Sequence, residues 1–536
     1  MPRLLQHWVN EQASRRPTNT ALVSGGDRLS YADLEARSNQ LARLLKDSGC
    51  RRGDRIALLT PKTPMAIAAL LGIYKADCTY VPLDPASPAS RLAGILDSCE
   101  IRSVIAGGPV APRLAELLAD GSRPSLRIGA LGELSPSGEA FPTFFTLDDL
   151  AAYSAEPVDC RNESDDPAHI LFTSGSTGTP KGVVITHASV IHFVEWATTY
   201  FGMDASDRVS AHPPLHFDMS FFDIFGAAAV GAEIHLVGPQ LNVMPNHLAS
   251  FIRESALTQW FSVPSSLNYM AKFDVVGFGD LPALRRVLWA GEVLPTTTLM
   301  HWMNRLPHVR FTNLYGPTET TISSSYYTVP ACPDDPLAAI PIGTACEGEE
   351  LLVLNEDGSP ADRGETGQLY IGGVGLAREY WRDQERTAAA FVRHPRRLSE
   401  RIYKTGDLAR VGDDGLVYFL GRNDSQIKSR GYRIELGEIE AALYAVPDVQ
   451  DGAVVALDTC SFEGAVICCA YATAIGKHVS PVTVRRDLGR LIPGYMLPAH
   501  LLQLDRLPTN ANGKIDRSRL KSVFKERLDA HAAQTA

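Results

Sequence analysis

The chain has 536 residues, of which 45% are hydrophobic and 21% are charged, a composition typical of a folded globular protein rather than a disordered one. At about 100 to 200 residues per domain, this length predicts two or more domains. The 61 acidic residues outnumber the 51 lysines and arginines and give a net charge of -10. This charge repels phosphate backbones and anionic lipid surfaces, which argues against nucleic acid as the main partner.

The chain carries no recognisable signal for a membrane or for export. No apolar run approaches the about 18 to 20 residues that a spanning helix needs. Residues 1–17 lack the apolar centre and cleavage site of a signal peptide. Nine cysteines are scattered without a C-x-x-C pair, a pattern typical of unpaired thiols in a reducing compartment. We therefore expect no membrane partner and a cytoplasmic location.

The first part of the chain alternates short apolar runs with longer helical periodicity. Residues 55–59 (RIALL) predict a strand, and residues 31–45 and 65–74 predict helices. This alternation is typical of α/β layers with parallel strands, and it recurs over residues 207–237 and 260–290. The sequence therefore predicts an α/β fold.

The residue pattern changes at two points toward the C-terminus. Residues 345–420 contain short strands and Gly-rich turns, which predict a β-rich subdomain, and about 100 residues after Gly421 have the pattern of a small α+β domain. We expect a large core over residues 1–423, a small mobile C-terminal domain over 424–525, and a flexible tail over 526–536.

Residues 171–187 (LFTSGSTGTPKGVVITH) combine an apolar strand, seven consecutive Thr, Ser and Gly residues, Lys181, and a second strand. Small residues let backbone N–H groups approach an anion, hydroxyls add donors and the lysine adds charge, so a polyphosphate suits this loop. The segment is not a Walker A loop, because Pro180 and Gly182 stand where that motif needs Gly and Ser or Thr. A flexible surface loop is the alternative interpretation of this segment alone.

Further motifs decide between these interpretations. They are NLYGPTETT at 313–321, YKTGDLAR at 403–410, the charged block at 421–440 and LPTNANGKIDR at 507–517. In this order and spacing they resemble the ANL superfamily of adenylate-forming enzymes, and within it the amino-acid adenylation domains of nonribosomal peptide synthesis. The resemblance covers essentially the whole chain. It implies an enzyme that stands alone and serves a separate carrier protein.

Enzymes of this superfamily join a carboxylate to the α-phosphate of ATP with loss of pyrophosphate, and then pass the acyl group to a thiol, usually that of a carrier's phosphopantetheine. The resemblance implies ATP and Mg²⁺ as cofactors. It assigns contacts with ATP to Thr173, Ser174, Gly175, Ser176, Thr177, Lys181, Tyr315, Asp407, Tyr418 and Arg422. Among these, Asp407 would accept the ribose hydroxyls, which suits a carboxylate. Tyr315 would lie against the adenine.

The resemblance assigns catalysis to Thr318, Glu319 and Lys514. Thr318 would contact the α-phosphate, and Glu319 would hold Mg²⁺, a cation that prefers oxygen ligands. Lys514 would bridge the substrate carboxylate and the α-phosphate, a role that suits a mobile point charge. Asp424 matches the family's hinge, and Gly431 would admit the pantetheine arm. Outside the family context, Lys514 would be a surface lysine and the last two would be ordinary turn residues.

The segment at 212–225 (HPPLHFDMSFFDIF) resembles the family's substrate-pocket motif. Asp218 falls where amino-acid-activating members place the carboxylate that pairs with the substrate ammonium, and N-capping of a short helix is its alternative role. Phe217 would stand near the reacting carboxylate, and Asp223 would be structural. By position, the rest of the pocket is formed by Met219, Phe222, Ser262, Leu288, Ala290, Leu314, Ile322 and Ser323.

None of these additional pocket residues is charged, so a charged substrate side chain would lose its hydration without gaining a partner. We therefore expect a neutral, largely apolar amino acid. The arrangement of Leu288, Ala290, Leu314 and Ile322 resembles that of stand-alone prolyl-carrier-protein ligases, which makes proline the first hypothesis. Phe222 and Ser262 depart from such a pocket, so alanine, another small aliphatic residue, a β-amino acid or D-alanine stays open.

Three other classes compete with this hypothesis. A CoA ligase for a carboxylic acid without an amino group would share the fold, but it would not need Asp218. A phosphotransferase would release ADP and would leave Lys514 and Asp407 unexplained. An inactive binding module would not need the intact set of Thr173, Lys181 and Glu319.

Overall fold

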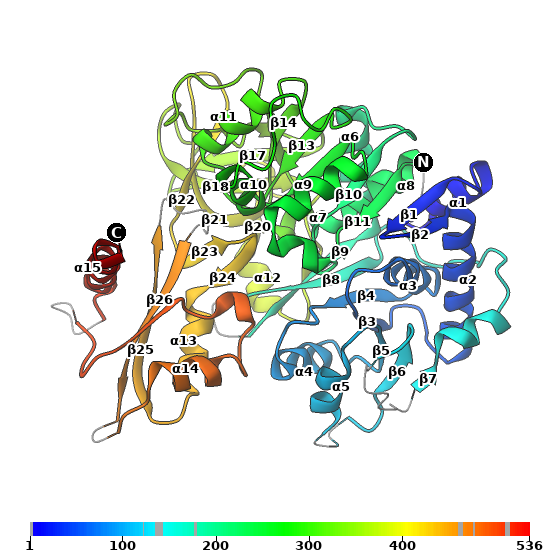
Figure 1. Cartoon of the computed structure of the whole chain (residues 1–536), viewed down its shortest axis with the longest axis horizontal. Coiled ribbons are helices and arrows are strands. Elements are labelled where there is room, and N and C mark those ends of the chain that lie inside the picture. The colour runs from blue at the N-terminus through cyan, green and yellow to red at the C-terminus, as the bar shows by residue number, and fades with distance from the viewer. Residues whose placement is uncertain are drawn as a thin grey trace. The chain divides into compact units, whose positions relative to one another are not determined.

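The computed structural model describes residues 4–119, 121, 123–134, 143–175, 179–458, 465–474, 477–509 and 515–535 (Figure 1). The chain forms two compact units. Unit 1 comprises Met1–Pro85, Leu96–Phe172 and Gly182–Asn423. Unit 2 comprises Ala86–Ile95, Thr173–Lys181 and Asp424–Ala536. The main run of unit 2 thus begins at Asp424, the residue that the sequence predicts to be the hinge.

A nine-stranded sheet has a parallel centre and antiparallel edges. In spatial order its strands are β16 (Thr344–Ala345), β15 (Ser325–Thr328), β14 (Arg310–Tyr315), β13 (Arg286–Trp289), β12 (Gln259–Ser262), β10 (Arg208–Ala211), β11 (Glu233–Leu236), β1 (Thr20–Ser24) and β2 (Asp27–Ser30). Because its central strands end at the same edge, the loops that follow them can converge on one ligand.

An eight-stranded sheet carries the first α/β repeats. Its order is β19 (Glu379–Tyr380), β9 (Lys181–Thr186), β8 (Pro167–Thr173), β4 (Thr79–Leu83), β3 (Arg55–Leu59), β5 (Ser103–Ala106), β6 (Arg127–Ala130) and β7 (Thr143–Phe145). The strand predicted at 55–59 is β3, and β3 pairs in parallel with both β4 and β5. The α/β fold predicted from the sequence is confirmed.

The β-rich subdomain is also present, as a five-stranded antiparallel sheet. It consists of β17 (Glu349–Leu354), β18 (Gly367–Gly373), β21 (Arg401–Val411), β20 (Phe391–Arg393) and β22 (Val417–Arg422). Strand β21 lies between β18 and β20 and also pairs with β22, which brings Asp407 opposite Arg422.

The longer helices of the first 273 residues are α1 (His7–Arg15), α2 (Tyr31–Asp47), α3 (Pro64–Lys75), α4 (Ala89–Ser98), α5 (Ala111–Leu118), α6 (His187–Phe201), α9 (Pro245–Glu254) and α10 (Pro264–Lys272). Among these, side chains cap the N-termini of α2, α3 and α6. The predicted helices at 31–45 and 65–74 are α2 and α3, which lie side by side (Figure 1). Ser30 and Asp33 form a capping box at α2, and the Thr63 side chain accepts the Ala66 amide at α3.

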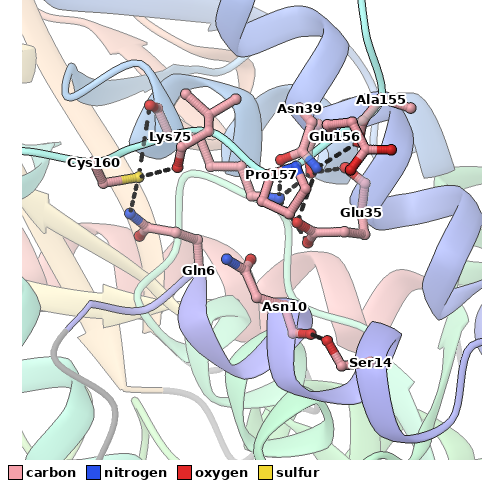
Figure 2. Close-up of polar contacts among 12 residues, drawn as sticks. Gln6, Asn10, Ser14, Glu35, Asn39, Lys75, Ala155, Glu156, Pro157 and Cys160 are labelled. Atoms are coloured by element: carbon pink, nitrogen blue, oxygen red, sulfur yellow. Dashed lines mark hydrogen bonds and ion pairs between the residues drawn. The ribbon is translucent and has the colours of Figure 1, made fainter.

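Between α2 and α3, the structure buries a lysine. Lys75 is 1% exposed, and its Nζ lies 2.6 Å from Glu35 Oε2 and 2.8 Å from both Ser38 Oγ and Asn39 Oδ1. Figure 2 shows Lys75, Glu35 and Asn39 directed toward one another. Burial of an ammonium is tolerated only where its donors are matched by acceptors, and here α2 supplies all three.

Unit 2 is the small α+β domain that the sequence predicts. The hairpin of β23 (Gln426–Ser429) and β24 (Tyr432–Glu435) precedes α13 (Leu436–Tyr444), and β25 (Val449–Asp458), β26 (Ala465–Thr473) and β27 (His500–Gln503) form a three-stranded sheet. Helix α14 (Pro481–Leu488) precedes β27, and α15 (Arg517–Thr535) ends the described chain. Residues 526–535, predicted as a tail, continue α15, because this stretch has no Gly or Pro and is rich in alanine.

Among the described residues, no helix is long and apolar enough to cross a membrane. The largest core lies in unit 1 and includes Tyr74, Phe221 and Phe225, whose rings pack near two buried histidines. His169 stacks on Phe221 with 3.9 Å between ring centroids, and the Tyr74 hydroxyl lies 3.1 Å from His169 Nδ1. Burial lowers the pKa of His187 to about 3, so both rings are neutral in the folded protein near pH 7.

These histidines predict acid sensitivity. A histidine with a lowered folded pKa stabilises the fold above its unfolded value of 6.5, and this stability is lost as the pH falls toward 3. For His187 the loss is roughly 1.4 kcal/mol per pH unit below about pH 6. A His187→Gln variant should show a correspondingly flatter decline in denaturant-derived unfolding free energy between pH 6.5 and 5. The exposed His247→Gln variant should retain the wild-type decline, and equal slopes in all three proteins would contradict the prediction.

Candidate functional site

The predicted phosphate loop follows β8. The Thr173 hydroxyl is buried and, among the described residues, has no hydrogen-bond partner, whereas Ser174 Oγ donates to the Arg433 carbonyl oxygen at 2.6 Å. The Gly175 amide donates to Glu438 Oε2 at 3.3 Å. Two of the donors predicted for phosphate are thus engaged with protein acceptors. Ser176 and Thr177 lie outside the described residues.

In unit 1, three of the predicted nucleotide residues meet at one carboxylate. Asp407 is 3% exposed, the Tyr315 hydroxyl donates to its Oδ2, and Arg422 Nη1 donates to its Oδ1. The Asp407 amide donates to Thr405 Oγ1 at 3.0 Å, and this hydroxyl donates to the Leu369 carbonyl at 2.7 Å. Each carboxylate oxygen has two lone pairs, so both retain acceptor capacity for a ribose hydroxyl.

Tyr315 is fixed as a hydrogen-bond donor. Burial and the charge of Asp407 raise the pKa of its phenol well above 10, so the proton stays on the tyrosine. The ring that packs near Tyr315 is that of Phe419, with centroids 6.4 Å apart. Tyr418 instead donates its hydroxyl to Asp414 Oδ2 at 2.7 Å, because neighbouring residues of β22 point to opposite faces. Among the aromatic rings of β22, the one that packs near Tyr315 is thus Phe419, and the role of Tyr418 beside the nucleoside stays a prediction.

Thr318 and Glu319 lie on a single turn of 3₁₀-helix, η4 (Thr318–Thr320), after β14. Glu319 is fully buried, its Oε1 accepts the Tyr380 hydroxyl at 2.7 Å, and its carbonyl accepts the Ala377 amide at 2.8 Å. Tyr380 therefore fixes the carboxylate predicted to hold the metal. The sequence analysis did not single out this tyrosine, which lies 61 positions away in the chain.

The two residues after η4 have an unusual backbone. Thr321 and Ile322 have φ angles of 57° and 68°, a region that β-branched residues rarely adopt. The Thr321 hydroxyl donates to the Gly375 carbonyl at 2.6 Å, and a side chain at Gly316 would come within 2.6 Å of Ser323 Cα. Neighbouring structure thus enforces this conformation, which is typical of ligand-binding turns.

Magnesium fits this turn. No group of three or more His, Cys, Asp or Glu side chains within the described ranges could hold a metal by itself. Mg²⁺ commonly needs only one or two carboxylates, because substrate phosphates and water complete its shell. The single oriented carboxylate of Glu319 meets that requirement.

Most of the predicted amino-acid pocket comes together in the large core. It brings together six apolar side chains, each at most 4% exposed: Met219, Phe222, Leu288, Ala290, Leu314 and Ile322. Ser323, which follows Ile322, is 2% exposed, and within the described part of the chain its buried Oγ has no hydrogen-bond partner.

Asp218 precedes α7 (Met219–Phe221) at the N-cap position, but its side chain makes no capping hydrogen bond. The capping role considered for it in the sequence is therefore not the one observed. Phe217 stands directly before it, and the Phe217 carbonyl accepts the Ser220 hydroxyl at 2.7 Å. The Ser220 hydroxyl thus ties the start of α7 back to the residue before Asp218.

Ser262 lies beside Ala290, whose amide donates to the Ser262 carbonyl at 3.4 Å, but its side chain is engaged elsewhere. Its Oγ accepts the indole N–H of Trp260 at 3.0 Å, and Trp260 belongs to a second core. Leu288 pairs with Phe261 on the neighbouring strand, so strand alternation directs Ser262 to the opposite face.

The predicted residues of unit 2 can be placed only in part. Lys514 lies outside the described residues. Gly431 follows Arg430 in the β23–β24 turn, and both have positive φ, 80° and 53°. The turn itself therefore favours glycine at 431, independently of any role in thiol access. Lys181 begins β9.

The chain thus combines a large α/β unit, which contains the buried carboxylate of Asp407, with a small α+β unit. The model of the AMP-binding enzymes matches residues 9–381, and that of the AMP-binding enzyme C-terminal domain matches residues 438–514. The chain belongs to the AMP-binding enzymes, the AMP-forming ligases that its motifs resemble.

Two relatives and two solved structures show how similar the chain is to other proteins in sequence and in fold. Bacitracin synthase 1 of Bacillus licheniformis is 35% identical over 97% of this chain, which spans only 9% of that synthase. The L-proline--[L-prolyl-carrier protein] ligase of Pseudomonas fluorescens is 34% identical over 96% of this chain and 98% of its own length. The chain thus spans about a tenth of the multidomain synthase but almost all of the ligase.

The Vibrio cholerae adenylation domain AlmE, solved in complex with glycyl-adenosine-5'-phosphate, shares the fold with a TM-score of 0.85 at 24% identity, over 98% of both chains. A nonribosomal peptide synthetase protein containing adenylation and PCP domains, bound to a vinylsulfonamide inhibitor, superposes with a TM-score of 0.79 at 26% identity. It covers 97% of this chain and 84% of its own.

The buried carboxylate predicts the effect of its removal on nucleotide affinity. Asp407→Asn keeps the shape but replaces one charge-assisted acceptor with a donor that faces Tyr315 or Arg422. Because such hydrogen bonds contribute about 1.5 to 3 kcal/mol, ATP affinity measured by calorimetry should fall roughly 10- to 100-fold. Asp414→Asn, an exposed acceptor in the same sheet, should change it less than about twofold. Unchanged ATP affinity in Asp407→Asn would assign Asp407 a purely structural role.

Proposed function

We propose that this enzyme activates a neutral, largely apolar amino acid as an aminoacyl-adenylate, releases pyrophosphate, and transfers the aminoacyl group to the phosphopantetheine thiol of a separate carrier protein. The first hypothesis for the amino acid is proline. The observation that carries the proposal is the set of six apolar pocket residues that belong to one core, one of which, Met219, directly follows Asp218. The full-length similarity to the L-proline ligase supports both the substrate class and the carrier as acceptor.

Each described part of the site meets one need of this reaction. ATP and the substrate carboxylate repel each other, so the enzyme must position both and compensate their charge. Asp407, with Arg422 and Tyr315, is suited to orienting the ribose. Glu319, oriented by Tyr380, would hold Mg²⁺, which would neutralise phosphate charge. Thr318 and Lys181 would contact phosphate oxygens, and Lys514 would supply positive charge at the reacting carboxylate.

Asp218 determines the class of acid that is activated. An α-ammonium group would compensate its charge, whereas an acid without an amino group would leave the carboxylate without this partner. The distinction between acids with and without an ammonium group involves a full charge, whereas the distinction between two aliphatic side chains does not. Ser323, whose hydroxyl has no partner among the described residues, would accommodate a polar edge of the substrate.

The alternative substrates make different demands on Asp218 and on the apolar pocket residues. D-alanine or a β-amino acid would keep the contact with Asp218 and change only how the apolar side chains are filled. A CoA ligase for a non-amino acid would not use Asp218. The solved protein with adenylation and PCP domains favours a carrier protein as acceptor over CoA.

Amino-acid-dependent exchange of labelled pyrophosphate into ATP tests the proposal directly. The panel should contain the protein amino acids, D-alanine and several β-amino acids, with aryl and fatty acids as the comparison set. We expect strong exchange with proline or another small apolar amino acid and none with charged ones. Exchange only with aryl or fatty acids would replace the proposal with the CoA-ligase alternative.

The role of Asp218 predicts a change in selectivity. Asp218→Ala should lower kcat/KM for the preferred amino acid by at least about 100-fold, because a buried charge pair loses one partner. The desamino analogue of the same acid is the control substrate, and its kcat/KM should not fall in parallel. Retained amino-acid activation would show that the ammonium is bound elsewhere.

A further inference from the structure

A partly buried lysine outside the predicted site lies against the segment that carries Asp218. Lys62 follows β3 and directly precedes Thr63, the N-cap of α3. Its Nζ donates to three consecutive backbone carbonyl oxygens, those of Ala211, of His212 at 3.0 Å and of Pro213 at 2.8 Å. Three acceptors use all three N–H groups of an ammonium, whereas a neutral amine has only two.

The three carbonyls begin the connection from β10 to α7. Two prolines, 213 and 214, stiffen it, and the Pro214 carbonyl accepts the Phe217 amide at 2.9 Å. The Phe217 carbonyl in turn accepts the Ser220 amide at 3.1 Å, which continues the backbone into α7. A chain of short contacts therefore leads from Lys62 to the turn that bears Phe217 and Asp218.

Asp223 lies in the same segment, and within the described ranges its two buried carboxyl oxygens have no hydrogen-bond partner. It is fully buried one turn after Asp218, in the element Phe222–Gly226. Burial lowers the pKa of Lys62 to about 7 and raises that of Asp223, and the attraction between the two groups opposes both shifts. The other titratable group that faces Lys62 is His212, whose Nε2 lies 3.0 Å from Asn242 Oδ1 and whose pKa burial lowers to about 3.

We infer that Lys62 acts as a clamp that positions Phe217 and Asp218 for the carboxylic-acid substrate through its three backbone contacts. Lys62 is a positioning residue, because it acts on the substrate through the backbone of residues 211–213. The contact between Asp218 and a substrate ammonium rests on the proposed function. The clamp itself requires only that the segment bearing Phe217 and Asp218 binds the acid.

The clamp predicts a selective loss of affinity for the acid. Lys62→Met removes the donors of three buried carbonyls, and the released segment must be ordered again when substrate binds. We expect the KM for the amino acid in pyrophosphate exchange to rise about tenfold, or about 1.4 kcal/mol, while the KM for ATP stays within about twofold. Lys62→Arg, which keeps the charge and the donors, should restore the KM for the amino acid to within about threefold.

The matched control is Lys75, a buried lysine outside the site. Lys75→Met breaks the network with Glu35 and Asn39 (Figure 2), so it should lower the melting temperature without a selective change in either KM. If Lys62→Met and Lys75→Met change the two KM values in the same way, Lys62 has only a structural role and the inference is overturned. If Lys62→Met does not fold, Lys62→Gln carries the test, because it keeps two N–H donors without the charge and should still raise the KM for the amino acid selectively.

Hydrogen exchange separates this inference from the proposed function. In Lys62→Met, the amides of Phe217, Ser220 and Phe221 should exchange faster than in wild type, and in Lys75→Met they should not. If the wild-type enzyme activates only acids without an amino group, the proposal for Asp218 fails, but Lys62→Met should still raise the KM for that acid. Unchanged exchange together with an unchanged KM for the acid would overturn the clamp alone.

Discussion

A charge removed from water must find its compensation inside the protein, and this constraint governs the large unit. Asp407 meets it with Tyr315 and Arg422, Glu319 with Tyr380, and Lys62 with three backbone carbonyls. In each case the desolvation cost is offset only if the partners stay in place. The surrounding sheets and turns must therefore be rigid, and the same rigidity positions the groups that would receive nucleotide and acid.

The sequence predicts the features of the fold that depend on local periodicity. Strand β3 coincides with the predicted residues 55–59, and α2 and α3 extend the predicted helices by one or two residues beyond the expected ends, because caps decide where helices begin and end. The continuation of α15 shows the limit of this approach. A polar, alanine-rich stretch has the same composition in a solvated tail as in the exposed end of a helix.

Only part of the site could be predicted, because a motif identifies residues but does not say in which direction their side chains point. Tyr315, Asp407 and Arg422 converge as expected, since pairing of β21 with β22 brings two of them opposite each other. Tyr418 and Ser262 point elsewhere, and only strand register determines that. Tyr380 and Lys62 carried no sequence signal: an isolated tyrosine or lysine is ordinarily a core or surface residue, and its partners here lie 61 and about 150 positions away.

The pocket distinguishes classes of acid by larger interaction energies than those that distinguish one amino-acid side chain from another. Compensation of a buried carboxylate is a matter of several kcal/mol, so a rigid Asp218 would strongly distinguish acids with an ammonium group from acids without one. Apolar pocket residues such as Met219, Phe222 and Leu288 would distinguish substrate side chains that differ by one methylene, a difference worth about 1 to 3 kcal/mol. Such discrimination by shape requires that these side chains do not rearrange around the wrong substrate. A clamp such as that of Lys62 on the segment entering α7 limits such adaptation, so specificity for the side chain depends on residues that never touch it.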